Sequence, residues 1–140
     1  MRTLIIFEEF YNLRKGISRP IPKKETLVIL HGYGGAGVLF FPIMKKLAKY
    51  FNLIFVDTIG LAGSSRPDNY KLDFTPKESI EYFVEYLENW RKSMKNVLYK
   101  IILKFSKSQI LASPSEFKDF ILSGHSFGGY IAGYYAYKYP

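Results

Sequence analysis

Three short runs of mostly apolar residues stand out along the chain, at residues 26–30, 52–57 and 120–124. Each run is continuous rather than alternating, which is typical of strands buried on both faces of a parallel sheet. A shorter run at residues 3–7 also fits a strand. Residues 14–24, which contain one glycine and two prolines, fit a loop.

Helical spacing of apolar residues separates the three runs. It extends over residues 39–51, where Pro42 must lie near the start of the helix. The predicted apolar face consists of Leu39, Ile43, Met44, Leu47 and Phe51. A second helix opens with the Thr-Pro-Lys-Glu sequence of a capping box at residues 75–78 and continues along one apolar face to Met94. A third pattern covers residues 127–139 and includes small residues that allow close packing on a sheet. This order of strands and helices predicts an α/β fold with right-handed crossovers.

The composition limits the chemistry that is open to the chain. Its 140 residues correspond to one domain. The chain contains no cysteine and two histidines, which excludes a disulfide framework, an iron–sulfur cluster, a cysteine nucleophile, a thiolate zinc site and a histidine-rich metal site. We therefore expect neither a metal nor a cofactor.

Hydropathy predicts no membrane-spanning or secretory segment. The longest apolar stretch, residues 38–44, is far shorter than the ~20 residues needed to span a bilayer. The N-terminal apolar run is too short for a signal peptide and lacks a small-residue cleavage site. We expect an intracellular, cytoplasmic protein, with the surface of a membrane or lipid droplet as an additional location.

The charge is strongly positive, with 20 basic and 12 acidic residues and a net charge of +8. Such an excess favours an anionic partner, either nucleic acid or an anionic lipid surface. Residues 89–115 contain six basic and no acidic residues. These basic residues alternate with aliphatic rather than aromatic ones, and no recognition motif is present. We therefore expect no nucleic-acid partner.

The sequence Gly-His-Ser-Phe-Gly at residues 124–128 matches the G-x-S-x-G motif of a nucleophile elbow. It follows an apolar strand and opens a helix, which is the setting that the elbow requires. Ser126 is thus a candidate nucleophile. Gly124 and Gly128 would keep the backbone and the neighbouring strand clear of the turn. The alternative is a glycine-rich turn that binds a phosphate or nothing.

A second glycine-rich segment, His-Gly-Tyr-Gly-Gly at residues 31–35, also follows a predicted buried strand. In acyl transfer, two backbone N–H groups must point at the developing oxyanion. The residue after the nucleophile, Phe127, supplies one of them, and Tyr33 is the candidate for the other. The alternative is a dinucleotide site, because Gly32, Gly34 and Gly37 have the G-x-G-x-x-G spacing and Asp57 lies about 20 residues on, although such a match alone is a weak signal.

Three motifs together resemble the α/β-hydrolase superfamily: Leu-His-Gly-Tyr-Gly-Gly, Val-Asp-Thr-Ile-Gly-Leu-Ala-Gly-Ser-Ser-Arg-Pro at residues 56–67, and Ser-Gly-His-Ser-Phe-Gly-Gly-Tyr. Ala62 departs from the middle motif, where an aromatic residue is common. The end of that motif and residues 88–91 are most similar to the lysophospholipase and lipid-droplet coactivator branch. The resemblance covers residues 26–94 and 118–140.

The resemblance implies a partial α/β-hydrolase fold and a serine hydrolase of carboxylic esters, lipid esters included. Ser126 would be the nucleophile and the N–H groups of Tyr33 and Phe127 the oxyanion hole. Gly32 would support the loop, His31 would shape it, and Asp57 would cap the loop that follows its strand. The substrate would be a small-molecule or lipid ester.

The catalytic acid and histidine of this fold follow the serine in the chain. The 14 residues after Ser126 contain no Asp, Glu or His. His125 adjoins the serine and should point elsewhere. The sequence therefore predicts a single truncated domain over residues 1–140, inactive alone, whose last strand is an exposed edge.

Two further functions compete with hydrolysis. The first is not an enzymatic function: the chain would be a non-catalytic scaffold or lipase regulator that uses the same fold. An acyltransferase motif with Asp five residues after His is absent, because Ala36 and Tyr130 stand at those positions. The oligomeric state is left open.

Residues 95–117 form a predicted insertion relative to the family. Within it, residues 95–107 combine an apolar stripe with lysines, which predicts an amphipathic helix in peripheral contact with a membrane or lipid surface. The alternatives are an insertion that packs on its own domain, or an unspliced intron. The apolar stripe consists of Val97, Leu98, Ile101, Ile102 and Phe105.

Overall fold

The structure is a computed structural model that describes residues 1–6, 24–105, 117 and 119–140, with the backbone alone over residues 98–105. Strands and helices follow one another as the hydropathy pattern predicts. The elements are β1 (Thr3–Ile6), β2 (Thr26–Leu30), the 3-10 helix η1 (Gly37–Phe40), α2 (Phe41–Leu47), β3 (Asn52–Val56), α3 (Pro76–Phe105), β4 (Ile121–Gly124) and α4 (Phe127–Lys138).

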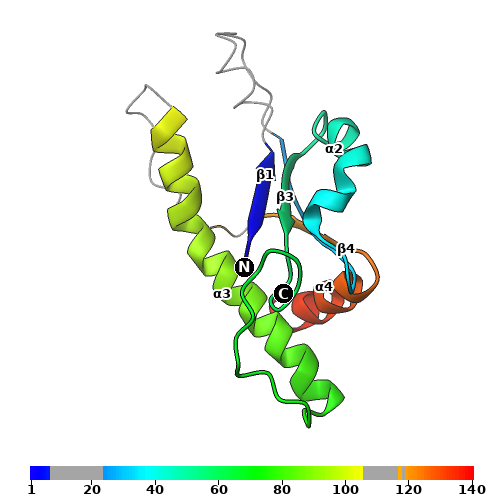
Figure 1. Ribbon diagram of the computed structural model, residues 1–140. Helices are drawn as coiled ribbons and strands as arrows, with labels where there is room; N and C mark the ends of the chain where they lie inside the picture. The colour runs from blue at the N-terminus through cyan, green and yellow to red at the C-terminus, as the bar shows by residue number, and fades with distance from the viewer. Residues whose placement is uncertain (7–23, 106–116, 118) are drawn as a thin grey trace.

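The described strands form one sheet in the order β1-β3-β2-β4. β2 runs parallel to both β3 and β4, with Val28 opposite Ile54 on one side and Leu122 on the other. β1 pairs antiparallel with β3. In the described part of the chain β4 borders β2 alone, so it is the edge strand that the sequence predicts. Because β2, β3 and β4 are parallel, the loops that follow them emerge at one edge of the sheet (Figure 1).

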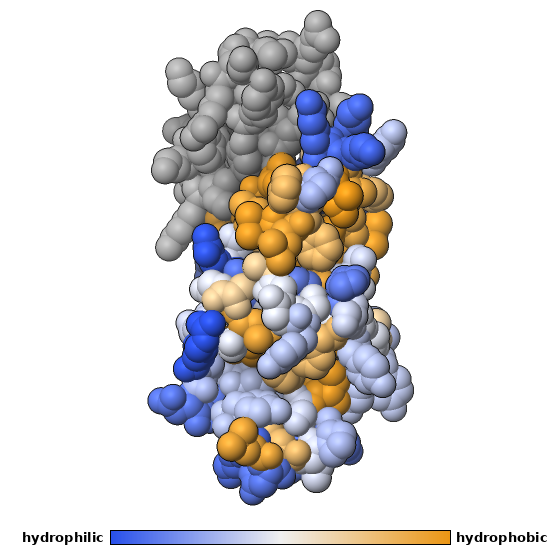
Figure 2. All heavy atoms as spheres, turned by 45° about the vertical axis from the view of Figure 1, so that its right-hand side comes forward, coloured by the Kyte–Doolittle hydropathy of each residue, from blue (hydrophilic) through white to orange (hydrophobic). Residues whose placement is uncertain are grey.

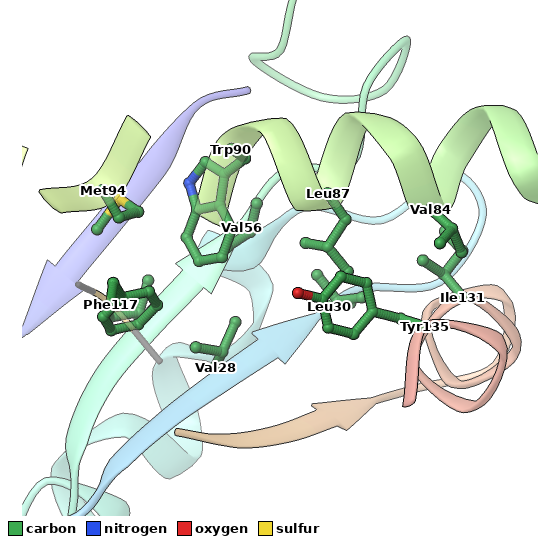
Figure 3. Packing of buried hydrophobic residues seen from close by; sticks show 11 residues of the cluster. Val28, Leu30, Val56, Val84, Leu87, Trp90, Met94, Phe117, Ile131 and Tyr135 are labelled. Carbon is green, nitrogen blue, oxygen red and sulfur yellow. The ribbon is translucent and has the colours of Figure 1, made fainter. Parts of the chain in front are cut away.

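Helices cover both faces of this sheet, which explains the continuous apolar runs. Alternate residues of β2 and β3 pack against α3 and α4, where Trp90, Leu87 and Val84 point down onto the strands (Figure 3). The intervening residues pack on the opposite face against Phe40, Met44, Leu47, Ala48 and Phe51. The core is therefore divided between two layers, one on each side of the sheet.

The helix that the sequence predicts over residues 39–51 is shorter in the structure, where α2 covers Phe41–Leu47. A 3-10 turn precedes α2, and the chain turns again after Leu47. Pro42 lies in the first turn of α2, as predicted. The predicted apolar face is wrong for Leu39 and Ile43, which are exposed. The 3-10 turn shifts the phase, so that the ring of Phe40 stacks on that of Phe55 with centroids 5.7 Å apart.

The capping box of α3 is confirmed. The backbone N–H of Thr75 donates to Glu78 Oε2 at 2.8 Å, and the N–H of Glu78 donates to Thr75 Oγ1 at 3.3 Å. The helix then continues to Phe105, beyond the predicted face that ends at Met94.

The backbone of the first part of the predicted insertion is thus a continuation of α3. The side chains of its apolar stripe from Leu98 onward lie outside the described residues, as do residues 106–116. No helix in the described ranges has the length and apolar character to cross a bilayer.

Candidate active site

Ser126 lies on a sharp turn between β4 and α4. Its backbone has φ +53° and ψ −119°, a left-handed conformation that a non-glycine residue adopts only under strain. The N–H of His125 donates to Leu30 O at 3.0 Å, and that of Gly128 donates to His125 O at 2.9 Å. These bonds tie the turn to β2 on one side and to the helix on the other, while Ser126 itself is exposed.

Two glycines make this turn sterically feasible. A Cβ atom at position 124 would lie 2.2 Å from the carbonyl of Gly128. A Cβ atom at position 128 would lie 2.5 Å from Leu30 O and 2.6 Å from His31 O. Real Cβ atoms do not approach backbone atoms so closely, so the helix, the turn and β2 meet at a spacing that glycine alone permits.

The glycine-rich loop after β2 passes directly beside the serine. A Cβ atom at Gly32 would lie 3.1 Å from Ser126 Cβ. The loop closes on itself through a hydrogen bond from the N–H of Gly35 to Gly32 O at 3.0 Å. Gly34 has φ +68°, which disfavours other residues. The structure thus brings the two glycine-rich motifs together, although they lie 93 positions apart in the sequence.

Loop and elbow enclose a cavity of about 440 Å³ that contains Ser126. Residues 31–36, Leu39, Phe40 and His125 line the rest of it. Within the described residues, the backbone N–H groups of Tyr33 and Phe127 donate to no protein acceptor. These two candidate oxyanion donors are therefore available to a ligand.

Both ring nitrogens of His31 form hydrogen bonds within the protein. The N–H of Thr58 donates to its Nε2 at 3.1 Å, so Nε2 must be unprotonated. Its Nδ1 lies 2.7 Å from Gly32 O, which can only accept, so Nδ1 carries the proton. The ring is neutral in this arrangement, and the 3.8 Å approach of Nε2 to Asp57 Oδ1 is not an ion pair. His31 shapes the loop, in agreement with the role that the resemblance implies.

Asp57 joins three segments near the site. Its Oδ1 accepts from the N–H of Gly37 at 2.8 Å and its Oδ2 accepts from the N–H of Gly63 at 3.1 Å. Its backbone carbonyl accepts a hydrogen bond from the Ser64 hydroxyl, and that hydroxyl accepts from the N–H of Arg2 at 2.7 Å. The carboxylate therefore holds the loops after β2 and β3 together and is not directed at Ser126.

No described side chain is positioned to deprotonate Ser126. Its hydroxyl has no hydrogen-bond partner among the described residues. His31 is occupied by the backbone, and the neighbouring His125 is exposed and makes no hydrogen bond to the serine. The described ranges also hold no group of three His, Cys, Asp or Glu side chains that could bind a metal ion.

A larger cavity of about 1020 Å³ adjoins the site. Tyr33 and Phe127 belong to its lining, and Tyr33 also lines the cavity that contains Ser126. The wall is mostly aromatic and aliphatic, and its charged members are Arg66 and Lys77. The sequence did not predict this cavity, because its wall is assembled from four separate segments.

A buried ionic network supports the helix that carries the elbow. Glu88 of α3 accepts from the Tyr135 hydroxyl of α4 at 2.7 Å and pairs with Arg91 through two hydrogen bonds of 2.8 Å. Arg91 holds the pKa of the Glu88 carboxyl well below its usual range, at about 2. Burial and the bond to Glu88 raise the pKa of the Tyr135 hydroxyl.

The comparisons with known proteins agree with this geometry. Residues 25–140 match the family model described as the alpha/beta hydrolase fold, and the chain belongs to that family. No solved structure matches the chain significantly.

Several curated proteins are similar to the chain. A probable 1-acylglycerol-3-phosphate O-acyltransferase of Oryza sativa subsp. japonica is 39% identical over 82% of the chain and 22% of its own length. A (lyso)-N-acylphosphatidylethanolamine lipase of Bos taurus is 32% identical over 89% of the chain and 29% of its own length. The 1-acylglycerol-3-phosphate O-acyltransferase ABHD5 of Mus musculus is 30% identical over 88% of the chain and 28% of its own length. The chain thus spans less than a third of these relatives.

Proposed function

We propose that Ser126 is the nucleophile of a serine hydrolase that cleaves carboxylic esters of lipids or small molecules. The observation that carries this proposal is the turn at Ser126, which combines a strained φ of +53° with two glycines whose replacement would produce clashes. A strained, exposed serine beside unbonded N–H groups is the arrangement that a nucleophile elbow requires. A phosphate-binding turn would need no exposed serine in this conformation.

In the proposed reaction the Ser126 oxygen attacks the acyl carbon and loses its proton to a histidine. The carbonyl oxygen becomes an oxyanion that accepts hydrogen bonds from the N–H groups of Tyr33 and Phe127. The histidine then protonates the leaving alcohol, and an acyl ester remains on Ser126. A water molecule, deprotonated by the same histidine, attacks this ester and releases the acid and the free serine.

The base of this reaction must come from sequence other than residues 1–140. The chain contains only two histidines, and the hydrogen bonds of His31 and the position of His125 leave neither free to serve Ser126. A serine hydroxyl without a base is a weak nucleophile. We therefore propose that residues 1–140 in isolation are inactive and form one truncated domain.

The lining of the second cavity favours a lipid ester. An acyl chain needs an apolar channel next to the oxyanion hole, and the cavity of about 1020 Å³ begins at Tyr33 and Phe127. The two cationic members of its wall, Arg66 and Lys77, can bind an anionic headgroup. The names of the lipase and acyltransferase relatives point to the same substrate class. Peripheral contact of residues 95–107 with lipid remains part of the proposal.

Activity-based labelling tests the nucleophile directly. The native protein, reacted with a fluorophosphonate and digested, should carry the modification on Ser126, and Ser126→Ala should abolish both labelling and hydrolysis of long-chain p-nitrophenyl esters. Ser65→Ala is the matched control, because Ser65 is an exposed serine of the neighbouring loop. Undiminished ester hydrolysis by Ser126→Ala would refute the proposal.

Acyl transfer is a second candidate, supported by the names of two of these relatives. An acyl group on Ser126 can pass to the hydroxyl of a second lipid instead of water, with the same proton transfers. Assays of the native protein with an added lysophospholipid acceptor separate the two outcomes, because transfer yields a diacyl product and hydrolysis yields free fatty acid. A scaffold or lipase regulator would yield neither and would keep its function in Ser126→Ala.

A further inference from the structure

An exposed apolar surface lies at the entrance of the Ser126 cavity. It consists of Val38, Leu39, Phe41, Pro42 and Ile43, and we refer to it as the α2 patch. Phe41 is 70% exposed, Leu39 62% and Val38 59%. Figure 2 shows apolar atoms gathered over the region of η1 and α2, with strongly hydrophilic atoms beside them. Single exposed apolar residues are common, but five within six consecutive positions indicate a contact surface.

The α2 patch is continuous with the candidate active site. Leu39 belongs to the patch and also lines the cavity that contains Ser126, as does its neighbour Phe40. Phe40 is held in place from below by its stacking on Phe55. The patch therefore adjoins the cavity of Ser126 through Leu39.

The exposed charges on α2 and the turn that follows it are all positive. Lys45, Lys46 and Lys49 follow the patch on α2 and the turn after it, and all three are exposed. From Thr26 to Val56 the chain contains no acidic residue. An exposed apolar patch followed by three exposed lysines is complementary to an anionic lipid surface, whose acyl chains are apolar and whose headgroups are negatively charged.

We propose that the α2 patch docks on an anionic lipid surface. Phe41 and Leu39 insert among the acyl chains, and the three lysines lie at the level of the phosphate groups. This orientation places the mouth of the Ser126 cavity against the lipid. Docking does not depend on catalysis by Ser126, and it involves a different segment of the chain from residues 95–107.

Vesicle flotation of the full chain tests the docking. Binding to phosphatidylcholine vesicles that contain phosphatidylserine should fall about tenfold or more in the double variant Leu39→Ser/Phe41→Ser. Leu72→Ser is the matched control, since Leu72 is 100% exposed on a distant loop and should bind as the wild type does. The triple variant Lys45→Glu/Lys46→Glu/Lys49→Glu should lose about a hundredfold on these vesicles and little on pure phosphatidylcholine.

The rival surface is tested in parallel. If Lys100→Glu/Lys104→Glu/Lys107→Glu abolishes binding while the α2 variants bind normally, lipid contact belongs to residues 95–107 and the inference is wrong. Vesicle binding by Ser126→Ala should equal that of the wild type. An inactive site with intact docking would thus refute the proposed function alone, and an active enzyme that ignores vesicles would refute the docking alone.

A second measurement does not rely on loss of binding. Because the chain has no cysteine, Phe41→Cys provides a single attachment point for a polarity-sensitive fluorophore. The dye should attach readily in solution, and its emission should shift to the blue when anionic vesicles are added. A site that resists labelling in the folded protein would mean that another part of the protein covers the patch, and it would overturn the inference. An emission spectrum that vesicles leave unchanged would overturn it as well.

Discussion

The Nε2 atom of His31 accepts a hydrogen bond from the backbone N–H of Thr58, 27 positions away, at 3.1 Å. The imidazole thus joins the loop after β2, which borders Ser126, to the loop after β3. Because its other nitrogen bonds Gly32 O, the ring spans the two loops from a buried position. His31 is a positioning residue for the oxyanion loop and not a base.

The two histidines should therefore respond differently to truncation. His31→Ala removes two buried hydrogen bonds and leaves a cavity, so we expect a loss of about 2–4 kcal/mol in the free energy of unfolding. His125→Ala removes an exposed side chain and should change it by less than about 0.5 kcal/mol. Urea unfolding of both variants measures the difference. Equal effects would show that His31 does not hold the loops.

Two glycines of α4, Gly128 and Gly133, should respond in opposite ways to replacement by alanine. Gly128→Ala forces a Cβ atom against Leu30 O and His31 O, and we expect it to cost about 4 kcal/mol or more and to displace the elbow. Gly133→Ala places its Cβ atom in open space on the same helix. It should stabilise the protein by about 1 kcal/mol through helix propensity. Thermal unfolding checks both signs, and a neutral Gly128→Ala would contradict the described packing.

Strain at the nucleophile predicts a conflict between stability and chemistry. Ser126→Gly relieves the φ of +53° and should raise the free energy of unfolding by about 1 kcal/mol, although it removes the reactive hydroxyl. Ser126→Ala keeps a Cβ atom in the same strained turn and should bring no such gain. The comparison by calorimetry isolates the backbone effect. Identical stabilities of the two variants would argue against strain.

Some elements of the fold and the site could be predicted because short stretches of sequence specify them. A continuous apolar run identifies β2, a Thr-Pro-Lys-Glu box identifies the start of α3, and the pairing of Ser126 with the glycine-rich loop follows from the family's motif order. The first two signals depend on residues within a few positions of one another, and the third depends on the order of motifs in the α/β-hydrolase family.

Other features depend on distant contacts and could not be predicted. Which side of α2 faces the sheet depends on the 3-10 turn that replaces Leu39 by Phe40 against Phe55. The network of Glu88 with Tyr135 joins residues 47 positions apart. The larger cavity arises only when α4 and the loop after β3 are placed side by side. No periodicity in the chain indicates these arrangements.

The buried carboxylate predicts a specific dependence on pH. Hydrogen bonds from Arg91, and then from Tyr135, lower the pKa of Glu88 from 4.5 to about 2 in the folded protein. A lowered folded-state pKa contributes stability that is complete above the unfolded value and is lost as pH falls through the folded value. We expect this contribution, about 3 kcal/mol, to disappear between about pH 4.5 and 2.

The test compares unfolding of the wild type and Glu88→Gln as a function of pH. Their difference should be largest near neutral pH and should shrink steadily across this acidic range. Glu85→Gln is the control, because Glu85 forms only an exposed ion pair with Lys138 at 3.3 Å, and its effect should stay below about 1 kcal/mol. A difference between the wild type and Glu88→Gln that does not change with pH would contradict the network.

The central claim is that Ser126 is a nucleophile whose base lies in other sequence. The most direct measurement is the rate of fluorophosphonate labelling at Ser126, mapped by mass spectrometry, in the native protein and in residues 1–140 expressed alone. We expect the native protein to react faster by a factor on the order of 10³ or more. Equal rates, whether both fast or both slow, would contradict the claim.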